Sequence, residues 1–405
     1  MSQFDVIVIG GGIVGATAAC ALGREGLTVA LVEARAPGTA ADESPRDARM
    51  YAVTRASERI FTALGVWDAI AAQGISEFRE MEVWDAGGAG RIHFDAAELG
   101  EPYLGCIIEP RLMQSALTQQ LAGLAGVELF CPARFRSIAI TAESAEIVLQ
   151  EGQTLSAKLV IAADGPQSRV REQVGISVRT HDYRQRSLVA LVSTERPHQD
   201  TAWQRFLPGG PLAFLPMHDG RCSIVWTRPA DTVDALLALD EADFHAALGQ
   251  AFDYRLGRIT ASELRQAYPL RRLHADHYVS ARVALVGDAA HAIHPLAGQG
   301  VNLGLLDAAT LAEVVTAAWR AGRDPGMLQV LRRYERWRRG DNLLMMAAMD
   351  GLNRLFSNAQ PPLQWARNLG LALMNRAGPA RRALMRHAMG FGADLPATAQ
   401  PPERE

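Results

Sequence analysis

The pattern of hydrophobic and polar positions predicts a βαβ unit at the start of the chain. Residues 5–9 form a short β-branched run that leads into glycines, and apolar residues then recur at helical spacing. Residues 27–33 form a second run of strand length that ends at an acidic residue. Two later apolar runs, residues 159–164 and 283–288, end in the same way. We expect these strands to be parallel, so that three strand ends converge on one ligand.

The rest of the chain changes from strand to helix patterning. Residues 81–94 alternate around a glycine-containing turn, and residues 187–227 hold β-rich runs that are broken at glycine and proline positions. These runs predict an antiparallel sheet. From about residue 305 onward the apolar spacing is helical. Gly378 and Pro379 are expected to divide the last part into two helices, because proline cannot continue the first and favours the start of the second.

Charge and composition exclude several classes of protein. The 405 residues include 41 Lys and Arg against 44 Asp and Glu, and a net charge of −3 argues against a nucleic-acid partner. Lys158 is the only lysine, which leaves little room for Schiff-base chemistry. The cysteines are far apart and form no CxxC pair, so neither zinc nor a redox dithiol is expected, and a cytoplasmic location fits best. They are Cys20, Cys106, Cys131 and Cys222.

The uncharged stretch of residues 6–23 is long enough to suggest a membrane span. It contains five glycines and follows Asp5 with no basic region before it, so a buried strand and helix are the better interpretation. No later segment is expected to approach the length of a span. Membrane contact, if any, is therefore expected to be peripheral, at the inner membrane.

Three glycines between the first strand and the first helix form a GxGxxG pattern in the context that this pattern requires. Gly10 is expected to allow the tight turn, Gly12 to let the backbone approach a pyrophosphate, and Gly15 to let helix and strand pack closely. Glu33 ends the second strand, where a carboxylate accepts hydrogen bonds from ribose hydroxyls. The pattern predicts dinucleotide binding at a helix N-terminus, without separating NAD from FAD.

Two acidic turns resemble motifs of the flavoprotein aromatic hydroxylases and favour FAD. Residues 162–171, with Asp164, resemble the DG motif of these enzymes, and residues 287–295, with Asp288, resemble their GD motif. A carboxylate at the end of a central strand can accept hydrogen bonds from ribityl hydroxyls, which NAD lacks. Asp288 is therefore expected to bind the flavin.

A glycine-rich loop follows this motif and opens a helix. Its first backbone amides are expected to face the flavin ring, where negative charge develops on reduction. We find no nucleophile or acid–base pair, so no side chain is assigned as catalytic with certainty, and the flavin is expected to carry the chemistry. The candidate residues of the loop are Pro295, Gly298, Gln299, Gly300, Val301 and Asn302.

Further segments resemble the ubiquinone-biosynthesis hydroxylases, a family of FAD-dependent monooxygenases that act on the prenylated ring of ubiquinone precursors. These segments are residues 47–57, 109–117, 210–216, 223–227 and 334–338. The resemblance implies flavin contacts, although Pro110 stands where asparagine is expected. The implied contacts are Arg49, Arg111, Gln114, Asp164 and Asp288.

We therefore expect an α/β fold in which a Rossmann-like FAD-binding domain is interleaved with an antiparallel-sheet substrate domain, followed by C-terminal helices. The FAD-binding domain is expected at residues 1–75, 100–180 and 270–345, and the sheet domain at residues 76–99 and 181–269. A C-terminal helical segment is expected at residues 346–390, and a loose tail at residues 391–405.

The implied reaction hydroxylates an aromatic ring. NAD(P)H would reduce a non-covalent FAD, O2 would form a C4a-hydroperoxide on the flavin, and an electron-rich ring would attack its distal oxygen. Three alternatives stay open: the same chemistry on a soluble aromatic compound, a flavin dehydrogenase or prenyl reductase, and a non-catalytic scaffold that keeps FAD for structure. The ring position, the choice between NADH and NADPH, and the oligomeric state, with a homo-oligomer as one option, are left open.

Other features have competing interpretations. His291 and His294 form an HxxH pattern, but they lie in the predicted flavin loop, and no metal is expected there. Four residues of the antiparallel sheet are candidates for the substrate pocket, although aromatic residues in strands more often belong to the core. These candidates are Trp203, Phe214, Pro216 and Trp226.

Residues 363–390 contain no acidic residue, five arginines and many apolar side chains. This composition suits helices that lie on a membrane surface or dock onto a complex of ubiquinone biosynthesis, where a prenylated phenol or quinol would be found. The competing interpretation is a pair of ordinary helices that cover the core, with their arginines in water.

Overall fold

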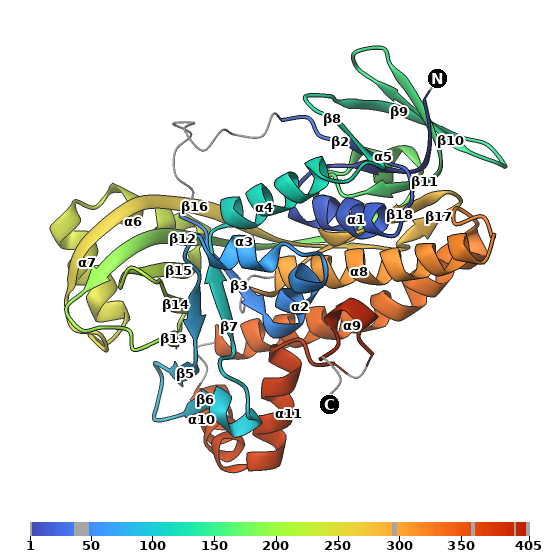
Figure 1. Ribbon diagram of the computed structural model, residues 1–405. Coiled ribbons are helices and arrows are strands. Elements are labelled where there is room, and N and C mark those ends of the chain that lie inside the picture. The colour runs from blue at the N-terminus through green and yellow to red at the C-terminus, as the bar shows by residue number, and fades with distance from the viewer. Residues whose placement is uncertain (1, 36–47, 294–297, 358–360, 393, 402–405) are drawn as a thin grey trace.

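The computed structural model describes residues 2–35, 48–293, 298–357, 361–392 and 394–401. Two large sheets lie next to each other, and long helices of the C-terminal part run across both of them (Figure 1). The predicted α/β class is confirmed, with a parallel sheet, an antiparallel sheet and C-terminal helices.

The first sheet holds the predicted βαβ unit. Its parallel strands follow the order β18, β11, β1, β2 and β8, and α1 (Ile13–Arg24) connects β1 to β2. The C-terminal four residues of β1, β2 and β11 are buried, which explains why their apolar runs are continuous rather than alternating. The strand bounds are Ser2–Ile9 (β1), Val29–Val32 (β2), Val127–Phe130 (β8), Phe135–Ile140 (β9), Ala145–Leu149 (β10), Thr154–Ala162 (β11), Val279–Ser280 (β17) and Val283–Leu285 (β18).

The second sheet is largely antiparallel, in the order β19, β16, β12, β15, β14, β13, β5 and β6. It extends beyond the predicted sheet domain, because β12 begins at Val178 and β16 continues to Ala275. The bounds are Glu80–Asp85 (β5), Arg91–Asp95 (β6), Val178–Thr194 (β12), Thr201–Leu207 (β13), Gly210–Pro216 (β14), Cys222–Pro229 (β15), Ile259–Ala275 (β16) and His291–Ala292 (β19). Helices α6 (Ala230–Ala238) and α7 (Glu241–Ala251) cover its outer face (Figure 1).

A small third sheet joins the two domains. It pairs β3 (Tyr51–Thr54) and β4 (Ser76–Phe78) with β7 (Gly105–Ile108). The remaining short elements lie around these sheets. They are α2 (Arg55–Ala63), α3 (Trp67–Ala71), η1 (Ala96–Leu99), α4 (Pro110–Ala122), α5 (Arg169–Gln173), η2 (Gly287–Ala289) and η3 (Ala397–Ala399).

Helix α8 (Gln299–Arg320) packs against α1 in the centre of the first domain. Within the described residues it is the one helix that is long and apolar enough to cross a membrane, which differs from the expectation that no later segment approaches that length. Of its most apolar stretch, 83% is buried inside the protein. Its composition is therefore that of a core helix.

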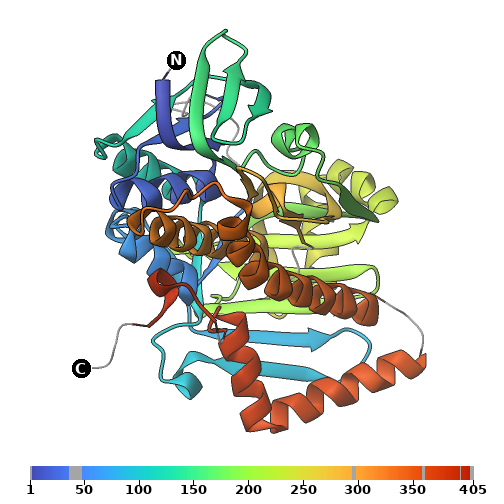
Figure 2. The ribbon, with the colours of Figure 1, turned by 90° about the vertical axis from the view of Figure 1, so that its right-hand side faces the viewer.

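The C-terminal helices form a layer along both sheets (Figure 2). Helix α9 (Leu328–Phe356) is followed by α10 (Pro361–Arg376) and α11 (Gly378–Ala388), so the predicted division at Gly378 and Pro379 is confirmed. Phe356 at the end of α9 stacks on Phe206 of β13, with ring centroids 3.9 Å apart. The layer therefore reaches β13 of the antiparallel sheet.

A buried ion pair attaches α10 to the hairpin of β5 and β6. The guanidinium of Arg367 donates to Asp85 through Nε at 2.6 Å and through a terminal nitrogen at 2.9 Å, and both side chains are almost fully buried. Asn368 Nδ2 also donates to Asp85, and Asn368 Oδ1 accepts from the Gly90 amide at 2.7 Å. Arg367 is thus part of the fold and is not one of the arginines that face water.

The prediction of a loose tail is wrong for residues 391–392 and 394–401. The guanidinium of Arg59 lies 4.4 Å from the ring centroid of Phe391, and the Trp337 indole N–H donates to the Asp394 carbonyl at 3.0 Å. Ala399 is fully buried in the core, where η3 contacts α2 and α8. The tail is ordered because its apolar residues find a surface that the local sequence does not reveal.

Arg367→Gln should lower the free energy of unfolding by about 3–5 kcal/mol, because it leaves the Asp85 carboxylate buried without its charge partner. Arg382→Gln is the matched control, since Arg382 is exposed on α11 and should change stability by less than about 0.5 kcal/mol. Urea unfolding followed by tryptophan fluorescence measures both. Equal stability of the two variants would contradict a buried attachment of α10.

Candidate functional site

Three strand ends meet at one edge of the parallel sheet. In the register of the sheet, Ile9 of β1 lies beside Ala162 of β11, and Ala162 lies beside Leu285 of β18. Parallel neighbours end on the same side, so the glycine pattern and the two acidic turns come together as the sequence predicted. In open α/β sheets this edge is where ligands bind.

The glycine turn after β1 is tightly packed on two sides and open at Gly12. Gly10 has φ +103°, and a Cβ there would lie 2.3 Å from the Ala163 carbonyl oxygen. A Cβ on Gly15 would lie 1.9 Å from the Gly10 carbonyl oxygen. Gly12 is the N-cap of α1, and a Cβ there would meet no protein atom within 4 Å. The turn therefore leaves space at the helix N-terminus, where a phosphate group is stabilised.

Glu33 and Gln114 both hold this turn. The Glu33 carboxylate accepts from the amide of Gly11 at 2.7 Å and from the amide of Arg35 at 2.7 Å. The Gln114 side-chain amide donates to the carbonyl of Gly11 at 2.7 Å. Two predicted cofactor residues thus lie at the glycine turn itself.

Asp164 organises the turn after β11. One of its oxygens accepts from the amides of Arg169 and Val170 at the start of α5, at 2.9 and 3.2 Å. The other oxygen, Oδ1, is buried and has no hydrogen-bond partner within the part of the chain that the structure describes. Arg171 links this turn to the next one by donating to the carbonyl of Ala289 at 2.8 Å, a contact that the sequence analysis did not assign.

Asp288 lies in η2, directly after β18. Its side chain is accessible to solvent, yet protein atoms surround it closely enough that desolvation raises the pKa of its carboxyl, while the nearby His291 acts in the opposite direction. Gly287 before it has φ +58° and packs against Val14 of α1. The turn thus presents one accessible carboxylate from an otherwise buried segment.

Helix α8 lies beside the turn after β18, because Gly304 in its second turn packs against Gly287 and Val14. Gly298 is the N-cap of α8 with φ +62°, and a Cβ on Gly300 would meet no protein atom within 4 Å. The first backbone N–H groups of a helix have no partner within the helix, so those of Gln299, Gly300 and Val301 are suited to an anionic group. Pro295 and His294 of the predicted loop lie outside the described residues.

The side chain of Asn302, one of the predicted cofactor residues, is bonded to protein partners. Its Oδ1 accepts from the Thr54 amide at 3.0 Å and from the Ser57 hydroxyl at 2.8 Å. Its Nδ2 donates to the carbonyl of Ala52 at 2.8 Å. Asn302 therefore fixes α8 against β3 and α2.

The two predicted arginine contacts have exposed side chains. The guanidinium of Arg49 lies 4.6 Å from the ring centroid of Tyr268 in the antiparallel sheet. Arg111 is at the start of α4, one turn before Gln114, and forms an ion pair with Glu109. Neither contact ties the arginine to the three turns.

The aromatic pocket candidates are buried core residues. Phe214 stacks on Phe252 of the segment after α7 with centroids 3.8 Å apart, and Trp203 and Trp226 pack in the same cluster. Pro216, two residues after Phe214, is also buried. Their rings face α6 and α7, so they do not line an open surface, and the core interpretation of these strand residues is the correct one.

The opposite face of the same strands carries partly exposed apolar side chains. Ala213 pairs with Val225, and Leu215 pairs with Ser223. The hydroxyl of Ser223 donates to the carbonyl of Ala48 at 3.3 Å, so this face looks toward the segment before β3. Strand alternation separates the residues of the two faces, but it does not indicate which face meets α6 and α7.

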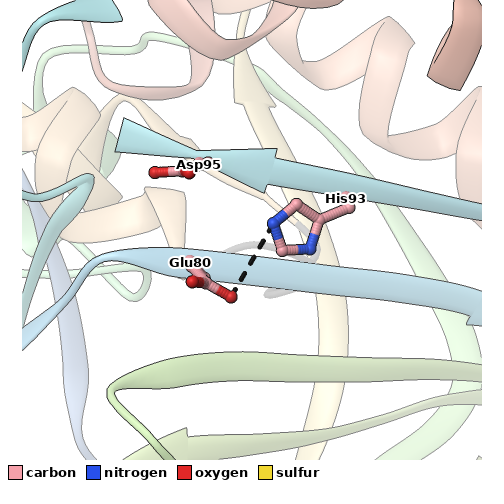
Figure 3. Close-up of side chains that lie close together, drawn as sticks. All are labelled: Glu80, His93 and Asp95. Atoms are coloured by element: carbon pink, nitrogen blue, oxygen red, sulfur yellow. Dashed lines mark ion pairs between the residues drawn. The ribbon is translucent and has the colours of Figure 1, made fainter. Parts of the chain in front are cut away.

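One group of three side chains in the described ranges comes close enough to hold a metal ion: Glu80, His93 and Asp95 (Figure 3). His93 Nε2 lies 3.7 Å from Glu80 and His93 Nδ1 lies 3.5 Å from Glu82, so both ring nitrogens already face carboxylates. The residues belong to the β5–β6 hairpin and are only partly buried. These contacts link the two strands of the hairpin, and we assign the cluster no role in the site.

Known proteins resemble this chain over most of its length. Residues 3–343 match the model of the FAD binding domain family. The chain is 42% identical to ubiquinone hydroxylase UbiL of Rhodospirillum rubrum, over 95% of this chain and 89% of that protein. It is 39% identical to the 3-demethoxyubiquinol 3-hydroxylase of Escherichia coli, over 96% of this chain and 98% of that protein.

Solved structures support the fold. The p-nitrophenol 4-monooxygenase PnpA from Pseudomonas putida DLL-E4 superposes with a TM-score of 0.77 at 20% identity, covering 96% of this chain and 99% of that chain. PqsL of Pseudomonas aeruginosa, in complex with 2-aminobenzoylacetate, superposes with a TM-score of 0.78 at 24% identity, covering 91% and 99%. At these sequence identities the similarity shows a shared fold only.

Proposed function

Because the chain belongs to the family of FAD-dependent ubiquinone hydroxylases, we propose that it hydroxylates the aromatic ring of a polyprenylated ubiquinone precursor. It is an FAD-dependent monooxygenase that uses NAD(P)H and O2. The observation that carries the substrate proposal is the similarity to two ubiquinone hydroxylases over nearly the whole length of both chains.

We propose that FAD lies across the three strand ends. Gly12 and the N-terminus of α1 would take the pyrophosphate, Glu33 the adenosine ribose, and Asp288 the ribityl hydroxyls. The open space at Gly12, the unpartnered Oδ1 of Asp164 and the accessible carboxylate of Asp288 all fit an extended dinucleotide. The bound flavin supplies the redox chemistry that inserts one oxygen atom into the ring.

In this proposal the protein orients the flavin and the substrate and excludes water from the site. The first amides of α8, at Gly300 and Val301, would stabilise negative charge on the flavin ring, helped by the dipole of a 22-residue helix. Asn302 holds these amides in place through its bonds to β3 and α2. The aromatic substrate would pack on the partly exposed face that includes Leu215 and Val225.

We propose that α10 lies on a membrane surface from which the prenylated substrate is drawn. Trp365, Leu369 and Leu373 are exposed and spaced by four residues, so they form one stripe along the helix. The stripe is fixed in position because Arg367 is anchored to Asp85 on the other side of α10. Exposed arginines of α11 follow it, which suits an anionic surface.

The cofactor placement predicts two different losses. Asp288→Ala should weaken FAD binding by about 1–3 kcal/mol, because ribityl hydroxyls would be left without a partner. Glu33→Ala should weaken binding at the adenosine end and leave the flavin absorption spectrum almost unchanged. Titration of the apoprotein with FAD measures both, with Asp231→Ala on the exposed start of α6 as control. Wild-type affinity in Asp288→Ala would contradict the placement.

The reaction can be tested by isotope labelling. With NADH or NADPH and ¹⁸O₂, the product of a prenylated phenol substrate should carry one ¹⁸O atom by mass spectrometry. NAD(P)H consumption with an unlabelled product would indicate a dehydrogenase or reductase, and no consumption would indicate a scaffold. Labelling of soluble ring compounds alone would refute the prenylated substrate.

The membrane proposal predicts a specific loss of vesicle binding. The triple variant Trp365→Ser, Leu369→Ser and Leu373→Ser should bind phosphatidylcholine–phosphatidylglycerol vesicles at least about tenfold less in a cosedimentation assay. Burying each large apolar side chain contributes roughly 1.5–3 kcal/mol. Leu129→Ser with Ile140→Ser is the matched control, because these exposed residues lie on β8 and β9 at the opposite end of the molecule (Figures 1 and 2). Equal binding of both variants would contradict the proposal.

A further inference from the structure

Asp307 is a fully buried carboxylate on α8 for which the mechanism above has no use. One of its oxygens faces the segment after β18, and the other faces α9. Oδ2 accepts from the Gly287 amide at 3.2 Å and lies 2.5 Å from Nε2 of His291. Oδ1 accepts from Nε of Arg338 at 3.0 Å and from Nδ2 of Asn342 at 3.1 Å, both on α9. The carboxylate therefore joins the turn after β18 to the C-terminal helix layer.

Every group that bonds the Asp307 carboxylate is itself buried. Burial by itself would raise the pKa of the Asp307 carboxyl, but His291 and Arg338 outweigh it and hold this pKa below its ordinary value. Arg338 is 1% exposed and also bonds Asn342 and Asp341. An ionised carboxylate at this depth is costly unless every acceptor is paired, which the four donors achieve.

The cluster acts directly on the turn that presents Asp288. Gly287, which donates to Asp307, precedes Asp288, and His291 follows it by three residues. Helix α9 also bonds the strand that leads into this turn, because the Tyr334 hydroxyl donates to the carbonyl of Leu285, the last residue of β18, at 2.7 Å. Asp288 itself is accessible to solvent, so its direction depends on how these neighbours hold its backbone.

We propose that Asp307 is a positioning residue for the cofactor: through Gly287 and His291 it fixes the turn so that Asp288 points at the ribityl chain of FAD. The inference rests on the proposed placement of FAD at Asp288. It is independent of which aromatic ring is hydroxylated.

The decisive variant is Asp307→Asn, which keeps the shape of the side chain. A carboxamide accepts with one side only, so its NH₂ group must face either the donors of the turn or the donors of α9. We expect the dissociation constant for FAD to rise about tenfold, a change within the range of coupling energies measured between contacting groups. The same substitution in an Asp288→Ala background should change FAD affinity less than about twofold, because the group being positioned is absent.

Asp350→Asn is the matched control for loss of another ion pair of α9, one that is partly buried. Asp350 pairs with Arg272 and accepts from the Tyr183 hydroxyl, so it attaches α9 to the antiparallel sheet instead of the turn. It should lower thermal stability while leaving FAD affinity and the visible circular dichroism of bound flavin unchanged. Asp307→Asn should change that dichroism. If Asp307→Asn does not fold, His291→Asn, which no longer reaches Asp307, should show a smaller loss with the same dependence on Asp288.

The outcomes separate the two proposals. A loss of FAD affinity that is equal with and without Asp288 would show that Asp307 only stabilises the fold, and would overturn the inference. Unchanged affinity in Asp307→Asn would overturn it as well. Unchanged affinity in Asp288→Ala alone would instead refute the placement of FAD on which the inference rests.

Discussion

The parallel pairing of β11 with both β1 and β18 is the constraint on which the rest of this structure depends. It brings three turns that are far apart in the sequence to one sheet edge. The turns are then joined to each other, because Arg171 bonds the carbonyl of Ala289 and Val14 packs against Gly287 and Gly304. The amides of two helix starts and an accessible carboxylate are thereby held in one place.

Helix α9 makes the two domains interdependent. Near its first third, Tyr334 bonds the last residue of β18, and Arg338 bonds Asp307, the buried partner of the turn after β18. Near its end, Asp350 bonds the antiparallel sheet, and Phe356 stacks on Phe206. Because α9 contacts elements of both sheets, it holds the strand ends of the parallel sheet in position relative to the antiparallel sheet. This arrangement supports a reaction in which two bound molecules must be held in register.

The sequence predicted those parts of the site that depend on local pattern. The glycine turn, the strand ends and the helix break at Gly378 follow from backbone requirements of a few adjacent residues. The buried pairs Asp307–Arg338 and Asp85–Arg367 join distant segments, and no local spacing distinguishes their members from exposed charges. The sequence also did not predict which side of the antiparallel sheet carries Phe214. A strand with large apolar residues at alternating positions does not indicate which of its two faces packs against the helices.

A crystal structure of the protein with FAD tests the central claim most directly. The account predicts one FAD stretched along the three strand ends, with its adenosine ribose at Glu33, its pyrophosphate at Gly12 and its ribityl hydroxyls within hydrogen-bond distance of Asp288. An FAD bound in the opposite direction, or away from this edge of the parallel sheet, would contradict it.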